Sequence, residues 1–181
     1  MEKGYKYIFW GIFAATFSIS LGPIRILPAF IAWAIVGAGL NEMKEDTGEV
    51  FFDSAIKHNR FLTIVLFLLG LFSLMGLGIE GYFLFAYLSF IPAILELITV
   101  FKILEGTINF FNSRDEKDLC RDLIEDQRKY LIWQLLVISG GIILVNIPNH
   151  TFIFLAGILS LGARIYLLAL VSRLKNTILL D

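Results

Sequence analysis

Two ionisable residues stand inside long apolar stretches of this sequence, and they are the residues best placed to do chemistry. Glu96 lies in the stretch 82–103 and Arg164 in the stretch 151–170. A charge inside a bilayer costs at least about 2.5–3.5 kcal/mol on insertion scales, so it normally faces other helices and has a partner. Counted inward from the ends that we assign to the outer face, both residues lie about 20 Å deep. We therefore expect Glu96 and Arg164 to meet.

Three interpretations of this pair remain open. It could be an ion pair that locks two helices together, or a site that touches a polar substrate, an ion or a proton path. Alternatively, Arg164 could extend its long side chain to the cytoplasmic rim. Gln134, Ser139 and Asn146 add polar groups to the stretch 130–147, where such residues most often make hydrogen bonds between helices. A functional site would be lined by Glu96, Arg164 and Gln134.

The groupings that catalysis needs are scarce in this chain. Its two histidines, His58 and His150, cannot supply an HExxH pair or a His-rich metal cluster. Ser139-Gly140-Gly141 resembles an intramembrane serine site, but His150 as its base would lie about 16 Å away on a continuous helix. No phosphate-binding glycine loop is present. We expect no enzyme activity, no metal and no cofactor.

The composition shows which kind of element must position these residues. Of the 181 residues, 57% are hydrophobic and 17% are charged, and the mean hydropathy is +0.78. Soluble domains are about 45–50% apolar and about 25% charged, so these values indicate a membrane protein. A net charge of −1 offers no basic surface for nucleic acid, and the single Cys120 excludes an intrachain disulfide framework.

The apolar stretches predict an all-α fold, a polytopic transmembrane helical bundle. A spanning helix needs roughly 20 apolar residues, and long runs without alternation exclude a β-barrel. The bundle is expected to form a single domain over residues 1–181. Its six predicted spans are 7–21, 24–40, 61–79, 82–103, 130–147 and 151–170.

The connections arrange these spans as three hairpins. Links within the hairpins are very short, whereas the links 41–60 and 104–129 are long and charged. All basic residues except Arg25 and Arg164 fall on the side of the termini and the long links. By the positive-inside rule, both termini and both long links are cytoplasmic. The predicted location is the cell membrane, with multiple crossings.

The first hairpin allows two other interpretations. Its short spans could form one re-entrant element, which would give five crossings and place the N-terminus outside. Residues 7–17 with Ser18-Ile19-Ser20 could instead be the core and cleavage site of a signal peptide. A further suggestion is an internal repeat, in which Ser89–Ile108 aligns with Ser160–Ile178.

The second long link is expected to contain an amphipathic cytoplasmic helix over about residues 114–129. Ser113-Arg114-Asp115-Glu116 has the spacing of a capping box, which predicts a helix start that continues into the fifth span. Glu125 and Lys129 stand four residues apart in the favourable order. The helix would serve as a connector at the membrane surface or as a docking helix for a cytosolic partner.

Small residues form a helix-packing stripe on the first span. Gly11, Ala14, Ala15 and Ser18 follow the i, i+3, i+4, i+7 spacing, so they share one helical face. Such a face lets another helix approach closely. The partner helix could belong to this chain or to another subunit.

Two resemblances to known proteins add to this picture. Ile26-Leu27-Pro28-Ala29-Phe30-Ile31 with Gly39-Leu40 resembles a pattern in small multispan bacterial membrane proteins of uncharacterised function, although those carry an acid in place of Ala29 and a glycine in place of Ala32. The resemblance implies a bacterial cytoplasmic membrane. In size, span number and the small residues Gly11 and Ala15, the chain is also similar to substrate-binding subunits of energy-coupling-factor transporters.

Two hypotheses about function follow. The chain could be a solute-binding or transport subunit with a polar site inside the bundle. Alternatively, it could be a membrane anchor, sensor or regulatory protein that contacts a partner through its cytoplasmic segments. The expected partners are the lipid bilayer and a membrane or cytosolic protein subunit, and nucleic acid is excluded.

Overall fold

Six α-helices make up almost all of the described part of the chain. The computed structural model describes residues 1–17, 20–21, 24–25, 28–47, 50–74, 90–146 and 150–178. The expectation of an all-helical fold is confirmed for these residues, apart from a short antiparallel β-pairing of Ser20–Leu21 with Ile24–Arg25. The helices are α1 (Glu2–Thr16), α2 (Ala29–Thr47), α3 (Asp53–Leu74), α5 (Phe90–Ser113), α6 (Lys117–Asn146) and α7 (His150–Ile178), and a 3-10 turn, η1 (Val50–Phe52), precedes α3.

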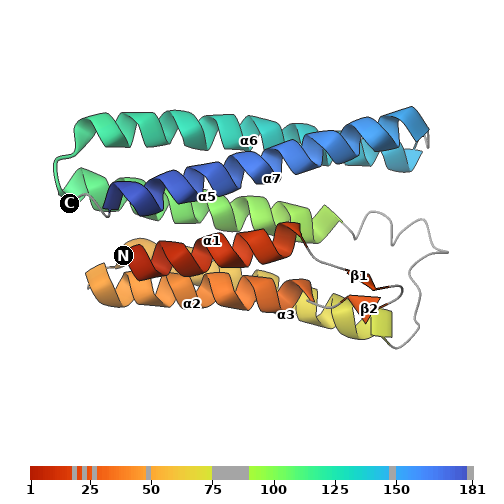
Figure 1. The fold of residues 1–181 in the computed structure, drawn as a ribbon, viewed down its shortest axis with the longest axis horizontal. Coiled ribbons are helices and arrows are strands. Elements are labelled where there is room, and N and C mark those ends of the chain that lie inside the picture. The colour runs from red at the N-terminus through yellow and green to blue at the C-terminus, as the bar shows by residue number, and fades with distance from the viewer. Residues whose placement is uncertain are drawn as a thin grey trace.

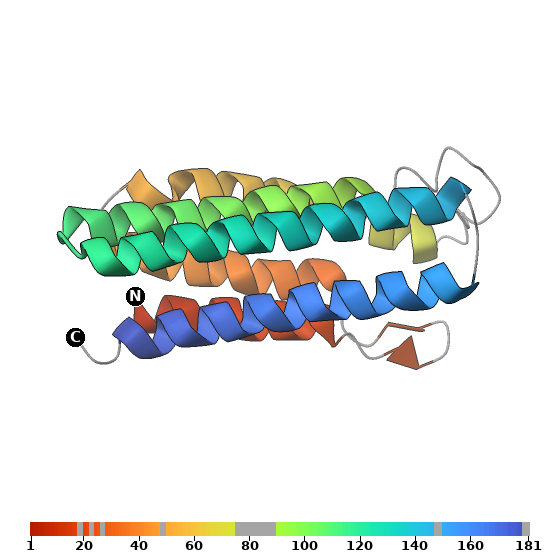
Figure 2. The same cartoon turned by 90° about the horizontal axis from the view of Figure 1, so that it is seen from above.

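The helices lie side by side with their long axes roughly parallel (Figures 1 and 2). Each helix packs against the next one in the chain, and α7 also packs against α1, so the neighbour relations close into a ring. Both termini lie at the same end of the bundle, together with the connections from α2 to α3 and from α5 to α6 (Figure 1). The opposite end holds the turn between α1 and α2.

The predicted link 41–60 is mostly helical, which corrects the expectation of a long loop there. α2 continues to Thr47 and α3 begins at Asp53. The reason is amphipathic periodicity: Met43 is buried, whereas Lys44, Glu45 and Asp46 face outward. A helix can therefore continue past the apolar stretch while its charges remain exposed. In the link 104–129, the expected helix is present from Lys117, and α5 also continues past residue 103 to Ser113.

The predicted capping box is also wrong. Ser113 is the last residue of α5, and its hydroxyl donates to the Phe110 carbonyl. Asp115 has a φ of 63°, its N–H donates to the Asn112 carbonyl, and the Glu116 N–H donates to the Phe111 carbonyl. This is the Schellman pattern that ends a helix. α6 therefore starts at Lys117 and then runs without a break through the predicted fifth span to Asn146.

The first predicted hairpin has different helix ends from those expected. α1 stops at Thr16 rather than at residue 21, and α2 starts at Ala29 rather than at residue 24. Between them, Ser20–Leu21 (β1) pairs antiparallel with Ile24–Arg25 (β2). Pro28 sets the start of α2, because its carbonyl accepts the Ile31 N–H and its ring suits the entry to a helix.

Apolar side chains lie both inside the bundle and over its outside. The core is formed by residues such as Tyr5, Trp33, Phe52, Leu104 and Leu167. Among the described residues, two helical stretches are long and apolar enough to cross a membrane, Val50–Phe72 and Ile153–Thr177. α1, with 15 residues, is shorter than the roughly 20 that a span needs.

Candidate functional site

Glu96 of α5 and Arg164 of α7 form a bidentate ion pair. Nη2 of Arg164 donates to Oε2 of Glu96 at 2.7 Å, and Nη1 lies 2.6 Å from Oε1. The two oxygens of the carboxylate thus face two nitrogens of the guanidinium, and of these two contacts the one between Nη2 and Oε2 is a hydrogen bond. The Glu96 side chain is 7% exposed and the Arg164 side chain 25% exposed. The carboxylate is therefore enclosed, and Nη1 of the guanidinium is buried beside it.

α6 supplies two further polar side chains to the interior at this level. Tyr130 is buried and lies within electrostatic reach of both Glu96 and Arg164. Gln134 follows one helical turn later and is also buried. Three helices, α5, α6 and α7, therefore contribute polar groups to one region of the bundle interior.

A second polar cluster joins α6 to α7 nearer the end that holds the termini. Asp126 accepts a hydrogen bond from the Tyr166 hydroxyl at 2.9 Å and is bound by the Arg173 guanidinium. The Asp126 side chain is only 12% exposed. About 12 Å of helix separates Asp126 from Gln134. The two clusters together line the contact between α6 and α7 with charge.

The sequence carries a signal for this second cluster in the buried face of α6. Cys120, Leu123, Tyr130 and Gln134 are buried on α6 at spacings that return to the same face. Position 126 falls on this face, so an acid there has to be paired. A charge on the apolar stripe of an amphipathic helix would have identified Asp126 as an inward-facing group.

The small-residue stripe on α1 faces α2 of the same chain. A Cβ added to Gly11 would lie 2.6 Å from Cγ2 of Val36 and 2.7 Å from the Ala32 carbonyl oxygen. Ala14 and Ala15 are half-buried, and Ser18 lies outside the described residues. A second close approach extends the contact, because a Cβ on Gly4 would lie 2.7 Å from the carbonyl oxygen of Gly39. Of the two possible partners for the stripe, the structure thus supplies an internal one.

α1 also reaches α5 across the bundle interior. The hydroxyls of Tyr5 and Thr107 are 2.5 Å apart, and Thr107 donates its own proton to the Ile103 carbonyl at 2.8 Å. Tyr5 is therefore the donor in the shared hydrogen bond. Both side chains are fully buried. This hydrogen bond connects α1 with α5, which are opposite each other in the ring of helices.

The remaining residues considered for chemistry are dispersed. Within the described ranges, no group of three His, Cys, Asp or Glu side chains could hold a metal ion. Nδ1 of His58 lies 2.8 Å from the Ser54 carbonyl, one turn back on α3. Ser139 is exposed on α6. Ser139 therefore faces away from the interior polar groups.

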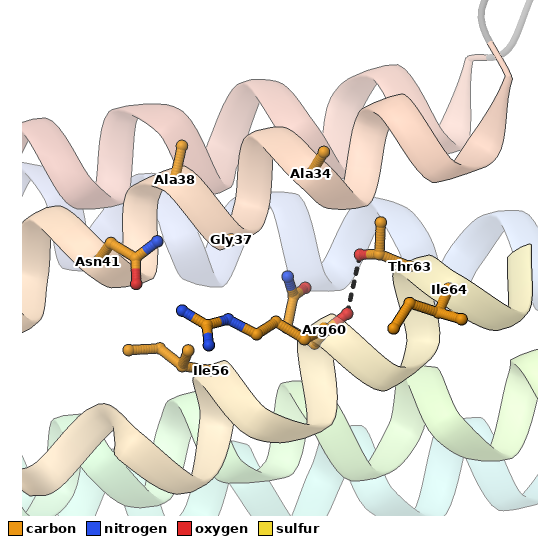
Figure 3. A pocket seen from close by; sticks show the side chains of 9 residues that line it. Ala34, Gly37, Ala38, Asn41, Ile56, Arg60, Thr63 and Ile64 are labelled. Carbon is orange, nitrogen blue, oxygen red and sulfur yellow. Dashed lines mark hydrogen bonds between the residues drawn. The ribbon is translucent and has the colours of Figure 1, made fainter. Parts of the chain in front are cut away.

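A groove between α2 and α3 is the other feature of the described surface that could bind a ligand (Figure 3). Asn59 lies at this contact, is 2% exposed, and donates from Nδ2 to the Trp33 carbonyl at 3.0 Å. Sequence reasoning placed the stretch 41–60 in a loop and so missed this groove.

Comparisons with known proteins return no match to this chain, whether with family models, with curated proteins or with solved structures.

Proposed function

We propose that this chain is a multi-pass integral membrane protein whose interior polar groups bind a polar solute. The observation that carries the membrane assignment is the distribution of side chains. Charged and amide groups such as Glu96, Asn59 and Gln134 are buried, whereas large apolar side chains cover the outside of the helices. Water would favour the reverse, and a bilayer favours this distribution.

The two most apolar helical stretches illustrate this pattern. In both Val50–Phe72 and Ile153–Thr177, only 22% of the residues of the apolar window are buried. The core helix of a soluble protein of this hydropathy would be mostly buried. Large apolar side chains face outward along both stretches, including Phe61, Ile64, Phe67, Leu68, Phe72, Ile153, Phe154, Leu155, Ile158 and Leu161.

We further propose six crossings with both termini in the cytoplasm. The six described helices lie parallel to one another, and their ends gather at two faces of the bundle (Figure 1). The face that holds the termini also holds the exposed basic residues Lys44, Arg114, Lys117 and Arg121, as the positive-inside rule requires of a cytoplasmic face. The short α1 is compatible with a locally thinned bilayer. The resemblance of the first hairpin suggests a bacterial cytoplasmic membrane.

The solute site is proposed at Glu96, Arg164 and Gln134. A charged pair inside an apolar exterior is costly and typical of substrate or ion pathways. The Arg164 side chain is 25% exposed, and its guanidinium is the group that an anionic or carboxyl-bearing solute would contact. In the absence of solute, Glu96 satisfies that guanidinium. The site therefore alternates between an internal ion pair and a solute complex.

The test is mass spectrometry of small molecules that co-purify with the protein in detergent. The wild type should retain a polar solute, and Arg164→Gln should lose it. Glu96→Gln removes the carboxylate that competes for Arg164, so it should retain at least as much of the solute as the wild type. Lys102→Gln is the matched control, because Lys102 pairs with Glu105 on the bundle exterior. Retention of the same molecules by all four proteins, or retention of none by the wild type, would overturn the solute site.

A second candidate function is a membrane-anchored interaction protein, favoured by the start of α6. The side chains of Asp118 and Arg121 are 100% and 80% exposed, and Asp122, Glu125 and Arg128 are also exposed. The apolar face of this segment packs inward through Leu123, so the charged face is the surface left for a partner. A protein that co-purifies in fixed stoichiometry, and is lost on charge reversal of Asp118 and Asp122, would favour this function.

A further inference from the structure

A groove lies between α2 and α3 (Figure 3), and its lining residues Ala34, Arg60 and Ile64 are exposed. Its volume is about 420 Å³, within the range of about 300–1,000 Å³ that is usual for ligand sites. α2 contributes small side chains and the backbone of Gly37, and α3 contributes Asn59, Arg60 and Ile64. Arg60 lies about 10 Å along α3 from its start at Asp53, near the face that holds the termini. In the proposed orientation, the groove lies at the cytoplasmic edge of the bilayer.

Arg60 gives the groove a positive charge. Its guanidinium extends along the groove toward Asn41 (Figure 3). None of the residues that line the groove is acidic, and in the described part of the chain Arg60 takes part in no ion pair. An arginine without an acidic partner at a membrane interface is suited to a phosphate group.

Asn59 provides a second and independent indication of a ligand. Its Nδ2 is fixed by the Trp33 carbonyl, and Gly37 makes room for it, because a Cβ there would lie 2.6 Å from that nitrogen. The other atom of the amide, Oδ1, is buried and has no hydrogen-bond partner among the described residues. A buried acceptor without a donor is costly, so a group with an O–H or N–H is needed at this position.

We propose that this groove binds an anionic phospholipid whose headgroup carries hydroxyl groups, of the phosphatidylglycerol type. The phosphate contacts Arg60, and a headgroup hydroxyl donates to Oδ1 of Asn59. The acyl chains follow the apolar side of the groove past Ile64, which is 57% exposed. This inference rests on the proposed membrane location.

The experiment uses the full chain extracted from membranes, stripped of lipid in detergent and titrated with single lipids by native mass spectrometry. Phosphatidylglycerol is compared with phosphatidylmethanol, which has the same phosphodiester charge but no hydroxyl. Phosphatidylcholine serves as the zwitterionic probe, and glycerol 3-phosphate tests binding of the phosphate without chains. We expect phosphatidylglycerol to bind with a dissociation constant about tenfold lower than that of phosphatidylmethanol.

The variants distinguish lipid binding in the groove from non-specific electrostatic attraction between the protein and anionic lipid. Arg60→Gln should weaken phosphatidylglycerol binding about tenfold, and Arg60→Lys should restore part of it. Arg128→Gln is the matched control, because Arg128 is exposed on α6 away from the groove. If Arg60→Gln does not fold, Asn41→Ala on the opposite wall and the comparison of lipids on the wild type still test the site.

Several outcomes would overturn the groove proposal alone. These are equal binding of phosphatidylglycerol and phosphatidylmethanol, an equal loss with Arg128→Gln, tight binding of glycerol 3-phosphate without chains, or a lipid-free dimer that blocks lipid binding. Recovery of the protein in the soluble fraction without detergent would overturn the membrane location as well. A failure of the groove proposal can therefore be distinguished from a failure of the proposed membrane location.

Discussion

The guanidinium of Arg164 and the carboxylate of Glu96 meet face to face inside the bundle, although 68 positions separate them in the chain. The contact joins α5 to α7, which are not neighbours in sequence order. Nη2 and Oε2 form a hydrogen bond, whereas Nη1 and Oε1 lie 2.6 Å apart without hydrogen-bond geometry, although both of these atoms are buried. The pair therefore contributes both to the packing of the helices and to the proposed solute site.

Removal of one partner should destabilise the protein more than removal of both. Glu96→Gln leaves an arginine without its counter-charge, which costs about 3–5 kcal/mol for a fully buried pair, and the partial exposure of Arg164 favours the lower end. The free energy of unfolding in detergent should fall accordingly for either single variant. The double variant Glu96→Gln/Arg164→Gln should recover part of the loss, whereas a loss equal to the sum of both would contradict the pairing.

The contact between α1 and α2 should be intolerant of any side chain at Gly11. Gly11→Ala places a Cβ against Val36 and the Ala32 carbonyl, and overpacking of this kind costs about 1–3 kcal/mol. Gly140→Ala is the control, because no neighbouring atom lies within 4 Å of its Cβ position. Thermal unfolding should show a lower Tm for Gly11→Ala and an unchanged or higher Tm for Gly140→Ala. Equal Tm values would be incompatible with the described α1–α2 packing.

The hydroxyl of Tyr166 should stabilise the cluster at Asp126. Tyr166→Phe removes the hydrogen bond to the carboxylate, and hydrogen bonds to charged groups contribute about 1.5–3 kcal/mol. Tyr7→Phe is the matched control, because Tyr7 is exposed. Chemical denaturation in detergent should show a loss for Tyr166→Phe alone. If both variants unfold at the same denaturant concentration, Tyr166 does not make this bond.

Cys120 should react slowly with thiol reagents. Burial of the thiol, and secondly the negative charge of Glu116, raise the pKa of Cys120 above its ordinary value. A raised pKa lowers the thiolate fraction at any given pH, and the thiolate is the reacting form. At pH 8, labelling by a neutral maleimide should be much slower in the folded protein than in detergent-denatured protein. Glu116→Gln should accelerate it, and fast labelling of the native wild type would contradict this environment.

The sequence was sufficient to predict the helices, their order and the residues of the central pair. Apolar stretches of span length and one isolated charge in each of two of them led to Glu96 and Arg164, because unpaired charges are costly in apolar surroundings. The alternation of short and long links along the chain likewise predicted that the spans form hairpins. Both kinds of signal depend on composition over many residues, so they do not require knowledge of tertiary contacts.

Boundaries and close contacts could not be predicted in the same way. The helix ends at Ser113 and Lys117 depend on the left-handed conformation of Asp115, which the sequence pattern did not distinguish from a capping box. The packing of Gly4 against Gly39 and the hydrogen bond of Asn59 to Trp33 depend on how α1, α2 and α3 are placed in space. Such contacts follow from tertiary packing, which a single sequence does not specify locally.

The most direct test of the central claim is the accessibility of single cysteines from the two sides of the membrane. In a Cys120→Ala background, Glu2→Cys and Asp118→Cys lie at the end that holds the termini, and Thr151→Cys lies at the start of α7. A membrane-impermeant maleimide should label Thr151→Cys in intact cells, and it should label the other two only after lysis. Labelling of Glu2→Cys in intact cells would support five crossings. Labelling of Asp118→Cys and Thr151→Cys from the same side would contradict the six-span bundle.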